Sequence, residues 1–451
     1  MEPKKMKSIL KAFHDAGVAA VIVGGTVRDK LLGRKSKDLD LASPLSVEEL
    51  KTKVVNQNWC NQVIDTGIAH GTVTIEYWDN PEDGPSQMIE VTQFRRDVEC
   101  DGRHATVEAT SFIEEDLARR DLTINAMAMD INENIIDPFK GQEDLNNKLL
   151  RTVGDANKRF TEDYLRIIRI YRFQATLPGT WTIEGDASIS ALRHADNVWE
   201  QISVERIIEE FNKVFNTLDA NVYKFLSSMW DLGILGKMLP ELNQGPHSPD
   251  KLIQNPTYHP EGSVLEHIFL AVQHAPTNRN CMLNRWMALL HDVGKPKSAA
   301  PSEKGDWFTF YGHETIGVDM MKQIGDRLKF PTELRKIAET LTRWHLYVHR
   351  TPATAKNVRK LQADVKREYL PLLEDLYTSD HMGRCTSEDA KVFFTPLPIP
   401  VKPVLMGKHL IARGHIPGPT FKPILDKAFE YQIETGELEI DNLYKKGVNK
   451  C

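Results

Sequence analysis

The sequence predicts an α+β protein in which a domain with a mixed sheet is followed by helical domains. Within residues 1–140, amphipathic stretches alternate with short β-like runs, namely AAVIV, DLDLA, GTVTIEY, MIEVTQF and MAMDI. After about residue 141 such runs nearly stop, and segments such as RIIRIYRF and VERIIEEFNKVF repeat apolar residues at helical spacing. Two breaks rich in proline lie at 239–262 and near 395–404.

These changes of pattern predict four modules. A chain of 451 residues is too long for one core, because domains usually hold roughly 100–200 residues. We expect the mixed-sheet domain at 1–140, a helical region at 141–240, a second helical domain at 241–395 and a tail at 396–451. The break at 239–262 is expected to be a linker.

Composition indicates a globular protein without a uniformly basic surface. Hydrophobic residues make up 41% of the chain and charged residues 27%, which is enough apolar surface for cores. Because the formal net charge is −6, any site for a polyanion must be a local cluster of Lys and Arg. The five cysteines are scattered without a C-x-x-C pair, and the N-terminal apolar run is too short for a signal or a membrane span. We therefore expect a cytoplasmic protein with no membrane partner.

Two aspartates in the run KDLDLA form the first candidate site. Alternation along a strand points Asp38 and Asp40 to one face and the leucine between them to the other. Paired carboxylates of this kind suit Mg²⁺, and two such ions can activate an attacking hydroxyl and stabilise a leaving pyrophosphate. Glu90, in the later run IEVTQFRR, is a candidate third carboxylate. The alternative is that these are solvated carboxylates on a strand surface.

A glycine turn precedes these aspartates in the sequence. The run AAVIV ends at Gly24 and Gly25 and is followed directly by the helix-like segment TVRDKLLG. Backbone N–H groups of such a turn can approach phosphate oxygens, and Arg28 could clamp the same triphosphate. A tight strand-to-helix turn without a ligand is the alternative.

These segments together resemble a known family. GGTVRDKLLGRKSKDLDLA is similar to the signature of class II tRNA nucleotidyltransferases and bacterial poly(A) polymerases, members of the polymerase β superfamily. LARRDLTINAMAMD (117–130) resembles a second family motif, which implies that Arg120 contacts nucleotide phosphate or ribose. TEDYLRIIRIYRF (161–173) resembles the nucleotide-selecting motif, and SVERIIEEF (203–211) resembles a helix that braces the neck. The resemblance implies a polymerase β-like nucleotidyltransferase domain with Mg²⁺, followed by an all-α neck and body.

Three arginines of the nucleotide-selecting segment share one side of a predicted helix. Arg166, Arg169 and Arg172 are spaced by three residues, and most of the other positions are apolar. Glu162 and Asp163 lie beside them. Buried arginines are costly unless they pair with carboxylates or a bound anion, so the segment predicts an internal nucleotide site. The alternative is a structural salt bridge.

Asp163 and Arg166 could select the base without a template. Cytosine and adenine both offer an amine donor beside a ring-nitrogen acceptor, which match a carboxylate and a guanidinium. Uracil and guanine offer a carbonyl and an N–H at these places, so buried polar groups would face like partners, at a cost of a few kcal/mol. The family resemblance implies this same role for the pair.

A second constellation lies in the downstream helical part. VLEHIFLAV, MALLHDVGKP and YTSDHMGR resemble segments of the HD phosphohydrolase superfamily. The resemblance implies four metal ligands: His267, His291, Asp292 and Asp380. Such a mixed N/O site suits Mn²⁺, Ni²⁺, Mg²⁺ or Fe²⁺ and could activate water for phosphoester hydrolysis. His313 and His345 could add ligands for a second ion. A single histidine is more often structural, so the prediction depends on the ordered set.

The leading interpretation is an enzyme that adds CCA to the 3′ acceptor end of tRNA from CTP and ATP, with an HD domain and a small tail. One alternative is a poly(A) polymerase or an enzyme restricted to A or to CC, because relatives share these motifs. Another is an HD phosphohydrolase whose N-terminal half binds RNA. Basic residues that could grip RNA are dispersed, among them Lys158, Arg159, Lys356 and Arg359, and a solvated helix face is the competing interpretation for each cluster.

Overall fold

A computed structural model describes residues 3–36, 39–65, 71–78, 86–100, 105–382 and 388–449. The chain divides into two units, Met1–Val214 with Ser228–Ile234 and Phe215–Ser227 with Leu235–Cys451. Each unit is described by itself. The four predicted modules are finer than this division and stay a prediction. Among the helices formed by the described residues, none is both long and apolar enough to cross a bilayer.

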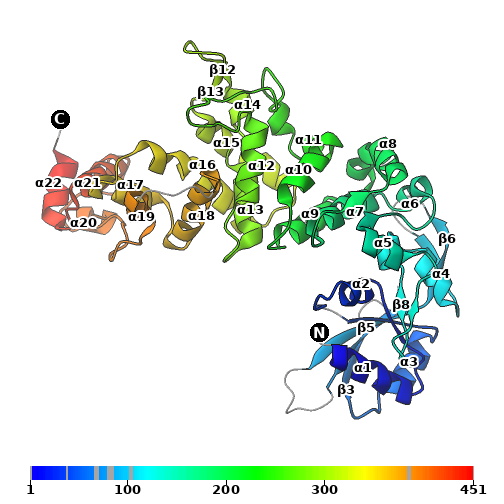
Figure 1. Cartoon of the computed structure of the whole chain (residues 1–451). Helices are drawn as coiled ribbons and strands as arrows, with labels where there is room; N and C mark the ends of the chain where they lie inside the picture. Colours follow the sequence, from blue (N-terminus) through cyan, green and yellow to red (C-terminus); the bar gives the residue numbers. More distant parts are fainter. Residues whose placement is uncertain are drawn as a thin grey trace. The chain divides into compact units, whose positions relative to one another are not determined.

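Within the described residues, the first unit contains a seven-stranded mixed sheet with the order β3-β4-β5-β2-β1-β8-β9 (Figure 1). β2 and β5 run parallel, and the other neighbouring strands run antiparallel. The strands are β1 (Val21–Val23), β2 (Leu39–Ser43), β3 (Cys60–Ile64), β4 (Thr72–Tyr77), β5 (Gln87–Gln93), β8 (Ala128–Met129) and β9 (Ile135–Ile136). The predicted α+β class with a mixed N-terminal sheet is confirmed.

Strands that the sequence did not predict lie at the margins of this sheet or outside it. β3 is a partly exposed edge strand of sequence CNQVI, and β9 has only two residues. β6 (Arg95–Cys100) and β7 (Ala105–Ala109) form a separate antiparallel pair. Strands exposed on both faces do not need alternating apolar residues, so they leave little signal in the sequence.

Helices of the first unit flank the sheet and continue into the neck. They are α1 (Pro3–Asp15), α2 (Gly25–Leu31), α3 (Val47–Val54), α4 (Ile113–Ala118), the 3₁₀ helix η3 (Thr123–Asn125), α5 (Gly141–Asn147), α6 (Ala156–Glu162), α7 (Leu165–Thr176), α8 (Gly185–Gln201) and α9 (Val204–Phe215), with the short parallel pair β10 (Leu149–Leu150) and β11 (Thr182–Ile183). One core cluster joins Val23 and Ala42 of the sheet to Leu117 of α4 and to Ala126. Apolar burial thus fixes the sheet against the segment that carries the second family motif.

The second unit is almost entirely helical, as predicted. Its elements, beginning with two helices near the division between the units, are α10 (Val222–Asp231), α11 (Ile234–Met238), η4 (Pro240–Asn243), α12 (Val264–Gln273), α13 (Cys281–Leu290), α14 (Lys295–Ser298), α15 (His313–Arg327), α16 (Thr332–Arg350), α17 (Ala355–Asp364), η5 (Arg367–Tyr369), α18 (Leu370–Asp380), α19 (Glu388–Phe394), α20 (Gly407–Ile411), α21 (Phe421–Thr435) and α22 (Ile440–Val448), with the two-residue strands β12 (Ala300–Pro301) and β13 (Phe308–Thr309). α12, α13, α16 and α18 pack against one another (Figure 1). α20 to α22 enclose a small cluster around Leu405, Leu410, Ala428 and Leu443.

The segment predicted to be a linker is instead packed into the second unit. Leu252 and Gln254 are buried, and Ile253 forms an antiparallel bridge with Ser263. The backbone N–H of Phe308 donates to the carbonyl of Ile253 at 2.8 Å. The proline and glycine content correctly indicated irregular backbone, but it does not determine whether such backbone is exposed.

Candidate functional site

Two carboxylates lie on neighbouring parallel strands of the first unit. Asp40 of β2 is the register partner of Glu90 of β5, and both side chains are exposed on the sheet surface. Leu39 and Leu41, on either side of Asp40, are buried, so the predicted alternation is confirmed there. Asp38 lies outside the described residues. The two carboxylates line a cavity of about 730 Å³.

The predicted glycine turn connects β1 to α2 beside this cavity. Gly24 has a positive φ of 70°, and a side chain there would collide with the guanidinium of Arg120. Gly25 begins α2 and lines the cavity together with Arg28 and Arg120. Arg28 is 9% exposed and donates from Nη1 to Oδ1 of Asn125 at 2.7 Å. The turn therefore brings a buried, oriented guanidinium to the cavity.

Buried carboxylates pair with the arginines of α7. Arg169 donates to Oδ2 of Asp121 at 2.8 Å from Nε and 2.6 Å from Nη2, and Arg172 Nε donates to Oε2 of Glu210 at 2.5 Å. Burial raises the pKa of Asp121, but the charge of Arg169 more than offsets it and holds that pKa well below its ordinary value. The guanidinium of Arg28 also lies 5.0 Å from the ring centroid of Phe173, a residue of α7. The arginines of α7 are thus charge-paired, and the nucleotide site stays a prediction.

Asp163 lies between two helices and outside the helix that carries the three arginines. α6 ends at Glu162, Asp163 is extended with φ −157°, and α7 begins at Leu165. Oδ2 of Asp163 accepts from Nη2 of Arg206 at 2.8 Å. Arg166 instead donates from Nη1 to Oε2 of Glu162 at 2.7 Å. Asp163 and Arg166 line the same cavity, but each is held by another residue.

Several side chains of this site were not predicted from the sequence. Four of them are Asp121, Asn125, Arg206 and Glu210, all of which line the cavity or bind residues that do. Arg206 and Glu210 are four residues apart and therefore lie on one face of a helix, which could have indicated that they act at the same site. The only indication of Asp121 in the sequence was its position directly after two arginines. Its partner, Arg169, belongs to the distant helix α7, so no local pattern pointed to the pair.

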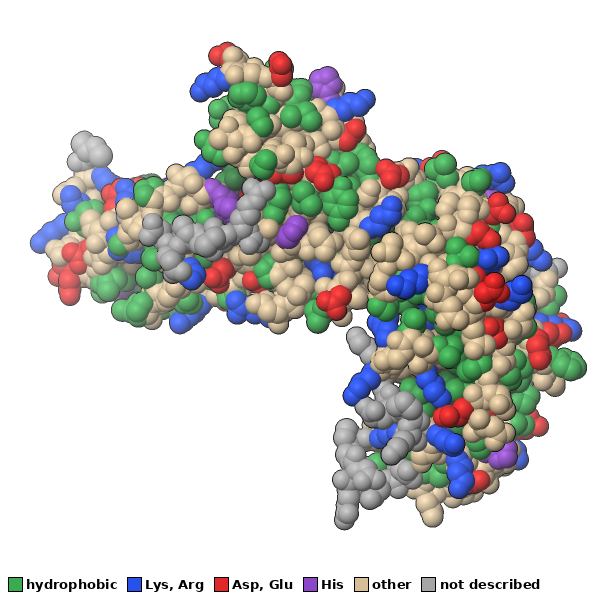
Figure 2. All heavy atoms as spheres, viewed as in Figure 1, with side chains coloured by type: hydrophobic (Ala, Val, Ile, Leu, Met, Phe, Trp, Pro, Cys, Tyr) green, Lys and Arg blue, Asp and Glu red, His purple; other side chains and the backbone are tan. Residues whose placement is uncertain are grey.

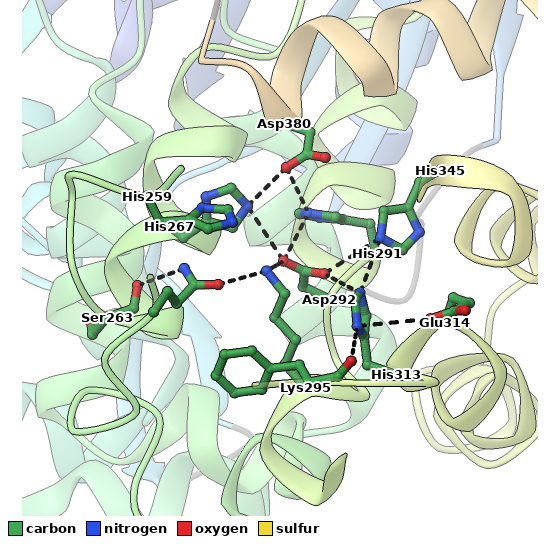
Figure 3. Close-up of polar contacts among 12 residues, drawn as sticks. His259, Ser263, His267, His291, Asp292, Lys295, His313, Glu314, His345 and Asp380 are labelled. Atoms are coloured by element: carbon green, nitrogen blue, oxygen red, sulfur yellow. Dashed lines mark hydrogen bonds and ion pairs between the residues drawn. The ribbon is translucent and has the colours of Figure 1, made fainter. Parts of the chain in front are cut away.

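A cluster of histidines and aspartates occupies the second unit (Figure 3). Six residues from five helices and their ends contribute: His267 of α12, His291 and Asp292 at the end of α13, His313 of α15, His345 of α16 and Asp380 of α18. Each of the four histidines and Asp292 is at most 2% exposed. Among the described residues, three groups have ligand atoms close enough for one ion each, and one of them contains the unpredicted residues His259 and Glu261 beside His267. The other two consist of predicted residues: His267, His291 and Asp380, and Asp292, His313 and His345. The predicted ligands come together, and so do the two histidines suggested for a second ion.

Asp292 lies between these two groups. Its Oδ2 lies 3.2 Å from Nε2 of His291, and its Oδ1 lies 3.1 Å from Nε2 of His313. In the first group, Oδ1 of Asp380 lies 3.0 Å from Nε2 of His267. A carboxylate that directs one oxygen to each group has the arrangement needed to bridge two ions.

The chemistry of the donor atoms fits a metal. His313 and His345 each donate from Nδ1 to a backbone carbonyl, at 2.6 and 2.7 Å, which leaves Nε2 of each ring directed into the cluster. These Nε2 atoms lie 3.3 Å apart and face Asp292, where a cation would satisfy both. Burial lowers the pKa of His345 to about 4, while for His291 the Asp292 carboxylate outweighs burial and raises the pKa to about 10. The carboxylates of the cluster therefore favour a positive charge beside His291.

Lys295 is a further residue of this cluster that the sequence interpretation missed. Its Nζ lies 2.5 Å from Oδ2 of Asp292 and donates to Oε1 of Gln254 at 2.7 Å. The available signal was its place three residues after Asp292 on the following short helix. A buried ammonium group at this position can neutralise the charge of Asp292 or bind an anion.

Basic residues nominated for RNA contact make several intramolecular contacts. Arg159 pairs with Glu162 at 2.8 Å, and Arg359 donates to the carbonyl of Ile433 at 2.7 Å. Acidic and basic side chains are interspersed on the face that Figure 2 shows. On that face the described residues form no uniformly basic coat, which agrees with the net charge of −6.

Comparisons with known proteins identify the family. Models of three families match: the poly A polymerase head domain at residues 20–151, the probable RNA and SrmB-binding site of polymerase A at 187–245, and the HD domain at 264–380. A multifunctional CCA protein of Halorhodospira halophila is 32% identical over 337 residues, which cover 73% of this chain and 74% of that protein. A CCA-adding enzyme of Streptococcus gordonii is 44% identical over 208 residues, or 46% of this chain and 48% of that protein.

Solved structures share the fold. The Bacillus stearothermophilus CCA-adding enzyme in complex with CTP aligns with a TM-score of 0.68 at 24% identity, covering 99% of this chain and 97% of that one. The Thermotoga maritima CCA-adding enzyme complexed with tRNA aligns with a TM-score of 0.57 at 18% identity, covering 99% and 96%. The resemblance seen in the sequence is confirmed. This chain belongs to the family of the multifunctional CCA proteins and CCA-adding enzymes.

Proposed function

We propose that this chain adds CCA to the 3′ end of tRNA from CTP and ATP without a nucleic-acid template. The pairing of Asp40 with Glu90 on neighbouring strands carries the proposal, because it brings two carboxylates to a cavity that also holds Arg28, Asp163 and Arg166. The names of the relatives support the same reaction and the same substrates.

The carboxylates of the sheet would hold the metal ions of this reaction. Exposed carboxylate oxygens of Asp40 and Glu90 are the hard ligands that Mg²⁺ prefers, and Asp38 is proposed as the third. Bound Mg²⁺ would supply the charge that activates the 3′-hydroxyl and stabilises the leaving pyrophosphate. Arg28 is oriented by Asn125 and Asp29 before a nucleotide arrives, which suits it to clamp a triphosphate.

Base selection is assigned to Asp163 and Arg166. Arg206 holds Asp163 and Glu162 holds Arg166, so neither side chain depends on the other for its orientation. A carboxylate and a guanidinium fixed independently at one cavity can meet the amine and the ring nitrogen of cytosine or adenine. Arg120, Arg169 and Arg172 line the same cavity and are proposed to contact the nucleotide.

Extension of a tRNA that lacks its 3′ end tests the proposal. The full chain is incubated with this tRNA and CTP alone, ATP alone or both, and the products are sequenced. We expect CC with CTP alone and CCA with both. Runs of A from ATP alone would instead identify a poly(A) polymerase. No extension under any condition would favour an HD phosphohydrolase whose N-terminal half binds RNA.

A second activity, metal-dependent phosphoester hydrolysis, is proposed for the second unit. The observation that favours it is the position of Asp292 between the two ligand groups. A bound Mn²⁺, Ni²⁺, Mg²⁺ or Fe²⁺ would generate a hydroxide nucleophile there. Lys295, beside Asp292, could bind the substrate phosphate. Hydrolysis of bis-p-nitrophenyl phosphate in each metal, by the full chain and by the Asp292→Ala variant, tests this activity. Equal rates in the two proteins would contradict it.

A further inference from the structure

The four cluster histidines differ in what holds the ring nitrogen that faces away from the cluster. Three of them donate from Nδ1 to the backbone carbonyl of the third residue before them: His291 (2.7 Å), His313 (2.6 Å) and His345 (2.7 Å). His267 is the exception among these four. Its Nδ1 lies 2.8 Å from Oε1 of Glu261, a side chain. Among these four histidines, only His267 has a ring held at Nδ1 by a side chain, which a substitution can remove.

Glu261 is placed to fix both the orientation and the tautomer of His267. Its side chain is 4% exposed and lies on the packed segment between η4 and α12. The same oxygen lies 2.9 Å from Nδ1 of His259. A carboxylate oxygen at this distance accepts from an imidazole N–H, so the contact holds a proton on Nδ1 of His267 and turns Nε2 toward the cluster.

Nε2 of His267 then points into the ligand group. This atom lies 3.0 Å from Oδ1 of Asp380 and 3.4 Å from Oδ2 of Asp292 (Figure 3). Without the carboxylate of Glu261, the buried Nδ1–H would lose its acceptor, or the proton would move to Nε2 and block the lone pair. Either change weakens a metal bond.

We propose that Glu261 is a positioning residue for metal binding in the second unit, acting through the ring of His267. The inference rests on the proposed metal site and adds a residue that is not itself one of its six ligands. Residues that orient metal ligands in this way typically change metal affinity by about 10–100-fold when they are removed. The segment expected to be a linker would therefore be part of the metal site.

Two other roles of Glu261 give different results. If Glu261, His259 and His267 held an ion of their own, as their donor atoms allow, removal of Glu261 would lower the number of ions bound. If Glu261 only supported the fold, its removal would lower thermal stability in EDTA without changing the Kd of the metal.

Titration of the full chain with Mn²⁺, measured by calorimetry, tests the proposal. We expect Glu261→Ala to raise the Kd for Mn²⁺ by about 10–100-fold without changing the number of ions. Glu261→Gln should retain most of the affinity, because its amide oxygen can accept the same hydrogen bond. His259→Ala should also retain affinity, since it removes the other partner of Glu261 and leaves His267 held.

Glu314→Ala is the matched control. Glu314 is also a glutamate beside a cluster histidine, at 3.8 Å from Nδ1 of His313, but the carbonyl of Phe310 already holds that nitrogen at 2.6 Å. Its removal should leave the Kd unchanged. Equal Kd values for wild type and Glu261→Ala, or fewer ions bound by that variant, would overturn the proposal while leaving the metal site intact. A wild-type chain that binds no Mn²⁺ would refute the metal site and the proposal together.

Discussion

The carboxylate of Asp163 accepts a hydrogen bond of 2.8 Å from the guanidinium of Arg206, a residue of α9, whereas Arg166, the arginine of its own sequence motif, donates its backbone N–H to the carbonyl of Asp163 at 3.0 Å. Arg166 is paired with Glu162 at 2.7 Å. The two residues assigned to base recognition are thus oriented by separate partners before a nucleotide binds. Such preorganisation avoids the entropy cost of ordering both side chains at the moment of binding.

Substitution of either residue should relax base selection. We expect Asp163→Ala and Arg166→Ala to lower the preference for CTP and ATP over UTP and GTP by about 100-fold, because the buried mismatch that rejects the wrong bases is lost. Incorporation assays with all four nucleotides measure this. Glu209→Gln, on the exposed side of α9, serves as the control. Unchanged selectivity in both variants would refute the role in base choice.

Neutralising the strand carboxylates should stop chain extension. We expect Asp40→Asn, alone or with Asp38→Asn, to reduce nucleotide addition by about 1,000-fold or more, because metal coordination would be lost. Glu76→Gln is the control, since Glu76 lies on β4 of the same sheet and binds Asn61 at 2.6 Å outside the cavity. Circular dichroism checks the fold. Full activity of the Asp40 variant would contradict the proposed reaction.

The pair of Asp121 and Arg169 should make the free energy of unfolding depend on pH in the acid range. Because the pKa of Asp121 is depressed in the folded chain, the unfolded chain takes up its proton first, at about pH 4. The contribution of the pair is therefore present above that pH and is lost as the pH falls toward the folded pKa. Asp121→Asn should lower the free energy of unfolding by about 3 kcal/mol at neutral pH, and by less at acid pH.

Urea unfolding followed by circular dichroism between about pH 7 and about pH 3 measures this difference. Asp186→Asn, at an exposed position in the first turn of α8, is the control and should show little dependence on pH. If the free energies of unfolding of wild type and Asp121→Asn differ by the same amount at every pH measured, the pKa of Asp121 is not depressed.

Removing Asp292 should empty the metal cluster. We expect Asp292→Ala to lose metal from both ligand groups, since its two oxygens face one group each. Elemental analysis of the dialysed protein measures the metal content. Asp306→Ala, which changes an exposed aspartate, is the control. Equal metal in wild type and Asp292→Ala would count against the assignment.

Local features of both sites could be predicted from the amino-acid sequence. Alternation in KDLDLA predicted which face carries Asp40, and the spacing of Arg166, Arg169 and Arg172 predicted a helix that needs charged partners. The resemblance of three segments to the HD phosphohydrolases implied that His267, His291, Asp292 and Asp380 form a metal site in the helical half. The alternation and the arginine spacing depend on backbone period and on residue type, which a short segment contains completely.

The contacts between residues far apart in the sequence could not be predicted and depend on how the segments pack. The order of the strands pairs Asp40 with Glu90, helix packing gives Arg169 its partner Asp121, and a packed loop brings Glu261 to His267. No local period encodes such partners, because each depends on burial shared by segments far apart in the chain. The same reason explains why the end of α6 at Glu162, which separates Asp163 from the arginine helix, could not be predicted from its apolar pattern.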